Sequence, residues 1–267
     1  MENFEYFRPE SLEHASILLG EDDEAKLIAG GMTLLPTMKL RLNEPSRLVD
    51  LSKLPELRGV DYQQDRLSIG AMTRHYDVSR DPLVMQKLPA LASLAGGIGD
   101  VQVRNRGTIG GSIANNDPSA DYPSACLALD ALLSTNKRVI LADDFFEGLF
   151  TTALDPAEIL TSVSFRIPQR AAYAKFRSMA SGYAVVGVFV AQYDDAVRVA
   201  VTGAGADGVF RLSMAEEALA QDFRPEALSD LKVDPATLMN EAACPQDYRA
   251  HLIGVMTRRA VVAALSG

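Results

Sequence analysis

Residues 96–112 read GGIGDVQVRNRGTIGGS, and no other stretch of this length contains as many glycines. Six glycines fall within the sixteen residues 96–111. Glycine has no Cβ and loses more conformational freedom on folding than other residues, so this density implies that backbone lies close to another group. The segment predicts a site for a polar ligand or, alternatively, a tightly packed loop. Small polar side chains that could hydrogen-bond a sugar or a phosphate accompany it: Thr108, Ser112, Asn115 and Asn116.

A second pair of glycines follows a short apolar run. Residues 26–36 read KLIAGGMTLLP, and we predict a strand over 26–29 that leads straight into Gly30-Gly31. Paired glycines after a strand leave backbone N–H groups exposed, with no Cβ to block an anion. Taken alone, the motif is as well explained by an ordinary strand-to-helix turn. Taken together, the two glycine segments predict a binding site for a phosphate or pyrophosphate.

A third glycine motif is predicted to have no such role. Residues 203–208 read GAGADG, which matches the spacing of a dinucleotide-binding fingerprint. That fingerprint requires a helix to begin at the glycines, so that its N-terminus meets the pyrophosphate. Here residues 209–212 have β character and the next helix is predicted only from Ser213. We therefore predict a loop rather than a nicotinamide site.

Composition and charge exclude several other classes. The chain has 267 residues, a net charge of −9 and two separated cysteines, Cys126 and Cys244. The negative charge would repel nucleic acid. Because the two cysteines are far apart in the sequence, we expect no disulfide framework, no zinc site and no cysteine-ligated iron–sulfur cluster. Three scattered histidines give no metal motif, so we predict no metal site. No apolar run spans a bilayer and no secretion signal opens the chain, so we expect a cytoplasmic protein without a transmembrane segment.

Periodicity predicts three successive units of mixed helix and strand. We place the first at 1–57, the second at 58–170 and an α+β unit at 171–267. Asp121 is placed to cap the helix predicted over 122–132. The remaining elements are predicted as follows: helices at 10–20, 35–42, 76–80, 88–95, 213–221 and 245–265; strands at 47–51, 137–141 and 159–166; hairpins at 60–70 and 184–202.

Several segments resemble the FAD-binding subunits of the molybdenum hydroxylases, the xanthine dehydrogenase family, and most closely the medium subunits of aerobic carbon monoxide dehydrogenases. The resemblance lies in IGDVQVRNRGTIGG at 98–111 and ANNDPSADYP at 114–123. It continues through KFR at 175–177, ASGYA at 180–184 and YRAHL at 248–252. It therefore covers nearly the whole chain.

The resemblance implies a vanillyl-alcohol-oxidase-type (PCMH-type) α+β fold, in which two α/β subdomains bind FAD and a C-terminal α+β domain follows. It also implies a dimer of heterotrimers. A large partner would hold the molybdenum cofactor and oxidise the substrate, and a small partner would hold two [2Fe–2S] clusters. Electrons would pass through the flavin to an external acceptor, which could be a quinone, NAD⁺ or oxygen.

The resemblance also implies roles for single residues. Thr33 would add a hydroxyl to the pyrophosphate site, Asp121 would hydrogen-bond the cofactor and Lys175 would place a positive charge near the reduced flavin. Tyr183 would lie against the isoalloxazine and is the candidate catalytic residue. The complete set of expected FAD contacts is Ile28, Ala29, Gly30, Gly31, Met32, Thr33, Leu34, Leu35, Ile98, Thr108, Ile109, Gly110, Gly111, Ser112, Asn115, Asp121, Leu160, Lys175 and Tyr183.

Simpler interpretations remain for three of these residues. Asp121 could act only as a helix cap, Lys175 could be an exposed charge and Tyr183 a core aromatic residue. Met32 and Ser112 depart from the residues common in the family, which puts individual side-chain hydrogen bonds in doubt but leaves backbone binding intact.

Two other functions are weighed against electron transfer. One is a non-catalytic FAD-binding assembly protein, and the other is a self-contained flavin oxidoreductase. The chain shows no acid–base pair for a substrate of its own, which disfavours the latter.

Overall fold

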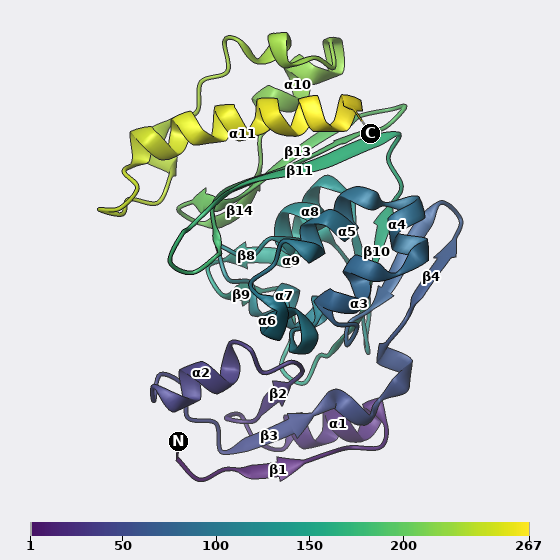
Figure 1. The fold of residues 1–267 in the computed structure, drawn as a ribbon. Coiled ribbons are helices and arrows are strands. Elements are labelled where there is room, and N and C mark those ends of the chain that lie inside the picture. Colours follow the sequence, from purple (N-terminus) through teal and green to yellow (C-terminus); the bar gives the residue numbers. More distant parts are fainter. Residues whose placement is uncertain (1, 267) are drawn as a thin grey trace.

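The computed structural model describes residues 2–266, and its secondary structure forms three successive units that are stacked from bottom to top in Figure 1. Each unit has its own sheet, and the buried apolar side chains form three clusters, two of which extend across the contacts between units. This arrangement is the α+β fold that the sequence predicts. The boundaries at 57/58 and 170/171 stay predictions. Among residues 2–266, no helix combines the length and the apolar character that crossing a membrane requires.

The first unit contains a small parallel sheet of order β1-β3-β2. Strand β1, which the sequence did not predict, is only three residues long and partly exposed, so it shows no clear alternation. Helix α2 ends earlier than predicted because Leu40 leaves the helical region and Arg41 has a φ of 57°. The elements are β1 (Glu5–Phe7), α1 (Leu12–Gly20), β2 (Lys26–Ile28), α2 (Leu34–Lys39) and β3 (Arg47–Asp50).

The second unit contains an antiparallel sheet of order β4-β5-β10-β6-β7. Its strands are β4 (Val60–Gln63), β5 (Arg66–Gly70), β6 (Leu132–Thr135), β7 (Val139–Leu141) and β10 (Leu160–Arg166). Short helices connect them: α3 (His75–Arg80), α4 (Pro82–Lys87), α5 (Pro89–Gly96), α6 (Val101–Arg106), α7 (Ile109–Asn115), α8 (Tyr122–Ala128) and α9 (Ala142–Phe145). A two-stranded ribbon, β8 (Phe146–Gly148) with β9 (Thr151–Thr152), completes the unit.

One helix prediction for the second unit was wrong. The helix predicted over 122–132 ends at Ala128, because Asp130 adopts a φ of 49° and residues 132–135 pair in the sheet as β6. The glycine-dense segment, for which a tightly packed loop was left open, contains the helices α6 and α7. Sequence reasoning missed them because glycines within and beside them disfavour a helix locally.

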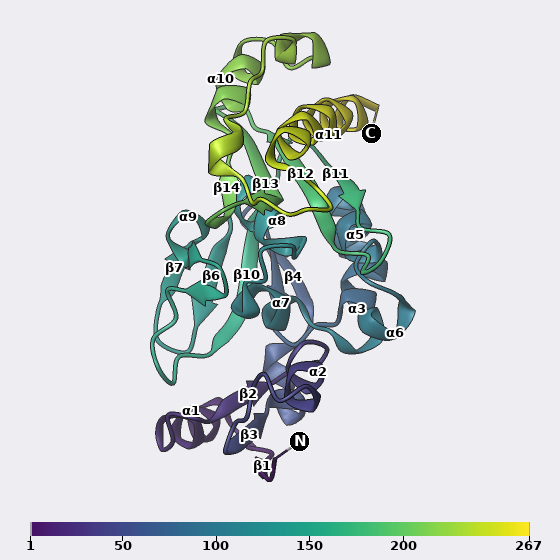
Figure 2. The same cartoon turned by 90° about the vertical axis from the view of Figure 1, so that its left-hand side faces the viewer.

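The third unit is a four-stranded antiparallel sheet, β11 (Arg170–Arg177), β12 (Ala184–Gln192), β13 (Val197–Gly205) and β14 (Gly208–Arg211). Helix α11 (Gln246–Ser266) packs on β11 and β12, while α8 and α5 contact the same sheet from the second unit (Figure 2). Helix α10 (Ser213–Gln221) contacts β13. Strands β12 and β13 are therefore covered on both faces and read as continuous apolar runs.

The GAGADG motif is the tip of a hairpin in this sheet. Strand β13 extends to Gly205 and β14 begins at Gly208, so most of the motif is strand rather than the predicted loop. Gly203 and Gly208 have φ values of 78° and 106°, which favour glycine. No helix begins at these glycines, so the motif lacks the helix N-terminus of a dinucleotide site.

Arg249 joins α11 to the sheet below it. Its guanidinium is 2% exposed and donates to the carbonyl oxygens of Val185 and Gly203 and to the Glu241 carboxylate.

Arg249→Met should lower the free energy of unfolding by about 3 kcal/mol, because two buried carbonyl groups lose their donor. Urea unfolding measures this change. Arg259→Met, at an exposed position of the same helix, is the control; equal effects of the two variants would contradict the assignment.

Candidate functional site

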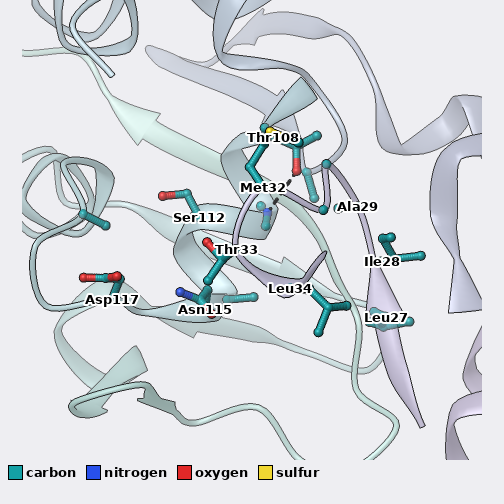
Figure 3. A pocket seen from close by; sticks show the side chains of 18 of the residues that line it. Leu27, Ile28, Ala29, Met32, Thr33, Leu34, Thr108, Ser112, Asn115 and Asp117 are labelled. Carbon is teal, nitrogen blue, oxygen red and sulfur yellow. Dashed lines mark hydrogen bonds between the residues drawn. The ribbon is translucent and has the colours of Figure 1, made fainter. Parts of the chain in front are cut away.

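A cavity of about 740 Å³ lies where the first and second units meet. Its walls come from the β2–α2 turn, from α7 and the loop after it, from β10 and from the loop at 181–183. Thr33, Ser112, Asn115 and Asp117 lie near one another in this region (Figure 3). The volume is in the range of cavities that enclose a small molecule or a cofactor.

The turn after β2 lines this cavity and has backbone donors that are not used within the described residues. Gly31 has a φ of 72°, which bends the chain sharply between the strand and α2. The carbonyl of Gly31 accepts from the N–H of Leu35, which closes the first turn of α2. In the described part of the chain, no backbone or side-chain hydrogen bond uses the N–H groups of residues 30–34 as donors. Five consecutive free N–H groups beside a cavity fit an anionic group such as a diphosphate.

The two glycine segments touch each other. A Cβ on Gly30 would lie 2.3 Å from the carbonyl oxygen of Arg106 and 2.6 Å from the Cα of Gly107. A Cβ on Gly107 would lie 2.6 Å from Nε2 of His75, and one on Gly110 would lie 2.4 Å from the Cβ of Ala71. At these positions glycine is required by close packing within the protein. The alternative interpretation of tight packing therefore accounts for a part of the glycine density.

The second glycine segment has no free N–H groups at the start of α7. Thr108 caps the helix through its side chain, which accepts from the N–H of Gly111 at 3.2 Å. The N–H of Ile109 donates to Thr73 and that of Gly110 to Ala71, and Ser112 donates to Thr108. The segment therefore offers the cavity its surface and side chains, with Ser112 and Asn115 among the lining residues, rather than free backbone donors.

Asp121 is the N-cap residue of α8, as predicted, but its side chain makes no capping hydrogen bond. The carboxylate is 4% exposed and accepts from Nζ of Lys175 at 2.9 Å and from the hydroxyl of Tyr173. Burial raises the pKa of the Asp121 carboxyl, and the Lys175 and Tyr173 donors oppose that rise. The Lys175 side chain is 11% exposed, so Lys175 is not an exposed charge.

Tyr183 lines the cavity and is 43% exposed, so it is a wall residue rather than a core aromatic. Burial and the nearby Asp117 carboxylate raise the pKa of its phenol, while Thr33 lowers it. The three side chains come from three different units of the fold. Through Tyr183 and Thr33, the loop at 181–183 lies close to the turn after β2.

Most residues predicted to contact the cofactor line this one cavity. The exceptions are Leu35, Ile109 and Lys175.

Sequence reasoning missed two lining residues with notable side chains. Asp117 lies in the ANNDPSAD stretch and has a pKa raised by burial. His75 is 4% exposed, and its Nδ1 has no partner in the described residues. A lone histidine carries no pattern that would have indicated its position.

Comparisons with known proteins agree with this geometry. Residues 2–170 match the family described as "FAD binding domain in molybdopterin dehydrogenase". The carbon monoxide dehydrogenase medium chain of Hydrogenophaga pseudoflava is 36% identical, over 98% of this chain and 96% of that protein. The nicotine 6-hydroxylase medium subunit of Paenarthrobacter nicotinovorans is 35% identical, over 97% and 96%.

This chain belongs to the FAD-binding medium subunits of the molybdenum hydroxylases. Its fold matches a solved structure of carbon monoxide dehydrogenase from Oligotropha carboxidovorans with a TM-score of 0.91 and 30% identity, covering 99% of this chain and 98% of the other. The family, the fold class, the cofactor FAD and the assignment as an oxidoreductase subunit are thereby confirmed.

The contact between the glycine turns should be sensitive to a single methyl group. Gly30→Ala should lower the free energy of unfolding by about 1–3 kcal/mol, because its Cβ would overlap backbone atoms. Thermal or urea unfolding of the full chain measures the loss. Gly148→Ala is the control, since a Cβ there has no neighbour within 4 Å. A Gly30→Ala variant as stable as the control would show that the turns do not pack as described.

His75 should make stability depend on acidity. Burial, followed by the charge of Arg104, lowers the pKa of His75 to about 4, against 6.5 for the free side chain. Folding favours the neutral imidazole, so the full contribution of His75 to the free energy of unfolding is present above pH 6.5. This contribution falls as the pH is lowered from 6.5 towards 4, by on the order of 3 kcal/mol. Urea unfolding between pH 7.5 and 5 should show a shallower decline for His75→Gln than for wild type. The exposed His14→Gln should follow wild type; a decline unchanged in His75→Gln would refute the assignment.

Proposed function

We propose that this chain is the FAD-carrying electron-transfer subunit of a heterotrimeric molybdenum hydroxylase, with a carbon monoxide dehydrogenase-like medium subunit as the nearest type. It would take electrons from a [2Fe–2S] subunit and pass them to an external acceptor, which could be a quinone, NAD⁺ or oxygen. The observation that carries the proposal is the row of five free N–H groups at residues 30–34 beside the cavity, in a chain of this family.

The residues of the chain would bind and orient the cofactor. The N–H groups at 30–34 would donate to the diphosphate, with the Thr33 hydroxyl beside them, and Ser112 and Asn115 would contact its polar groups from α7. Ile98 and Tyr183 would contact the ring system, and the Asp121 carboxylate would accept from a polar edge. Bound FAD supplies the redox chemistry itself, which explains why the cavity needs no acid–base pair for a substrate.

The partners follow from the same reasoning. The relatives named above are medium chains or subunits, which implies smaller and larger chains beside them. Among the described residues, no group of three or more His, Cys, Asp and Glu side chains could hold a metal ion. Molybdenum and iron–sulfur centres would therefore sit on partner chains. We propose one small and one large partner, paired into a dimer of heterotrimers.

Cofactor selectivity tests the binding site. The full chain, freed of flavin and titrated, should bind FAD much more tightly than riboflavin, because only FAD offers a diphosphate to residues 30–34. Gly31→Ala should weaken FAD binding about tenfold, because a φ of 72° costs alanine about 1–2 kcal/mol and the free turn should relax into another conformation that FAD must reverse. Flavin fluorescence measures both affinities. Equal affinity for FAD and riboflavin, or no flavin binding at all, would contradict the proposal.

The electron-transfer role is tested in the intact complex. A tagged chain, expressed together with its partner chains, should co-purify with iron and molybdenum, and its flavin should be reduced by a substrate of the complex. Flavin that binds but is never reduced would favour the assembly-protein alternative. Turnover of an organic substrate by the isolated chain would favour a self-contained oxidoreductase.

A further inference from the structure

A buried group of three polar side chains lies behind the cavity wall formed by Asp121. Asp121 starts α8 in the second unit, whereas Tyr173 and Lys175 lie on β11 in the third. We propose that Tyr173 is a positioning residue for the FAD site: together with Lys175 it fixes the direction in which the Asp121 carboxylate faces the cofactor. The inference rests on the proposed function, and it adds a residue that does not line the cavity.

The geometry of the group is specific. Tyr173 and Lys175 are two residues apart on one strand, so both side chains leave the same face of the sheet. The Tyr173 hydroxyl donates to Oδ1 of Asp121, and Nζ of Lys175 lies 2.9 Å from both Oδ2 and Oδ1. Tyr173 and Lys175 together thus hold both carboxylate oxygens. A carboxylate gripped at both oxygens cannot rotate freely.

The neighbouring strand is adapted to the Tyr173 phenol. Gly187 of β12 pairs with Lys175, and a Cβ on Gly187 would lie 2.2 Å from the Tyr173 hydroxyl oxygen. Phe189, which pairs directly with Tyr173, stacks on its ring at 6.0 Å between centroids. A glycine inside a buried strand weakens it, so its presence here indicates that the space is needed for the phenol.

The arrangement decides what Asp121 can offer the cavity. A carboxylate has about four lone-pair positions, and Tyr173 and Lys175 use at most three of them. At least one remains to accept from an N–H or O–H group of the cofactor. Lys175 also offsets the negative charge, which would otherwise repel an anionic ligand. The groups that face Asp121 are Tyr173, Lys175 and Arg177 from β11, Tyr122 from α8 and Tyr183 from the cavity wall.

Loss of the Tyr173 hydroxyl should weaken FAD binding in a pH-dependent way. Burial already raises the pKa of Asp121, and without the Tyr173 donor it should rise further. In the full chain, reloaded with FAD and followed by flavin fluorescence, Tyr173→Phe should lower the affinity about tenfold. The loss should grow as the pH is lowered, because Asp121 should become protonated at a higher pH in the variant than in wild type and a protonated Asp121 loses an acceptor position.

Tyr193→Phe is the matched control. The Tyr193 hydroxyl also joins the third unit to the second, donating to the carbonyl of Ala128 at 3.2 Å, but it does not contact Asp121. If Tyr173 acts only as a structural link, both variants should show the same affinity and the same pH profile, and the inference is overturned. If wild type itself fails to bind FAD, the proposed function fails instead.

A double variant tests whether Tyr173 acts through Asp121. Asp121→Asn keeps the shape of the side chain but removes its charge and its titration. Tyr173→Phe combined with Asp121→Asn should bind FAD no more weakly than Asp121→Asn alone. Additive losses, or an Asp121→Asn variant with wild-type affinity and pH profile, would overturn the inference even if Tyr173→Phe alone proved too unstable to measure.

Discussion

The close approach of Gly30 to Arg106 and Gly107 is the constraint on which the rest of the site depends. At this point the first and second units meet backbone to backbone, with no side chain between them. The approach places the free N–H groups of residues 30–34 beside the start of α7. The cavity is therefore bounded by units whose sheets are separate, and a Cβ on Gly30 would disturb the contact that holds the first two together.

The two glycine segments have different chemical roles within this contact. The turn after β2 keeps its N–H groups free and can bind an anion directly. The start of α7 donates its N–H groups to Thr73, Ala71 and the Thr108 side chain, so it is a rigid support. Behind them, Lys175 and Tyr173 hold Asp121 from the third unit, so all three units contribute to one site.

Much of this site could be predicted from the sequence, because close backbone approach requires glycine and the positions of glycines can be read directly from the sequence. The glycines at 30–31 and 107–111 were found in this way, and the family resemblance extended the predicted contacts to 28–35 and 108–112, of which Leu35 and Ile109 do not line the cavity. The sequence could not show that the N–H groups of one segment lack acceptors while those of the other have them. That difference depends on the carbonyl groups of Thr73 and Ala71, which are brought close only by the fold. The short helix α6 and the roles of His75 and Tyr173 likewise follow from tertiary contacts that leave no local period.

The central claim is that the N–H groups of residues 30–34 bind a diphosphate, and amide hydrogen exchange resolved by residue tests it most directly. Saturating FAD or ADP should slow exchange at residues 30–34, whereas riboflavin, which has no phosphate, should not. Exchange at 109–112 should change less, because those N–H groups already have partners. FAD that binds while exchange at 30–34 stays unchanged would contradict the account.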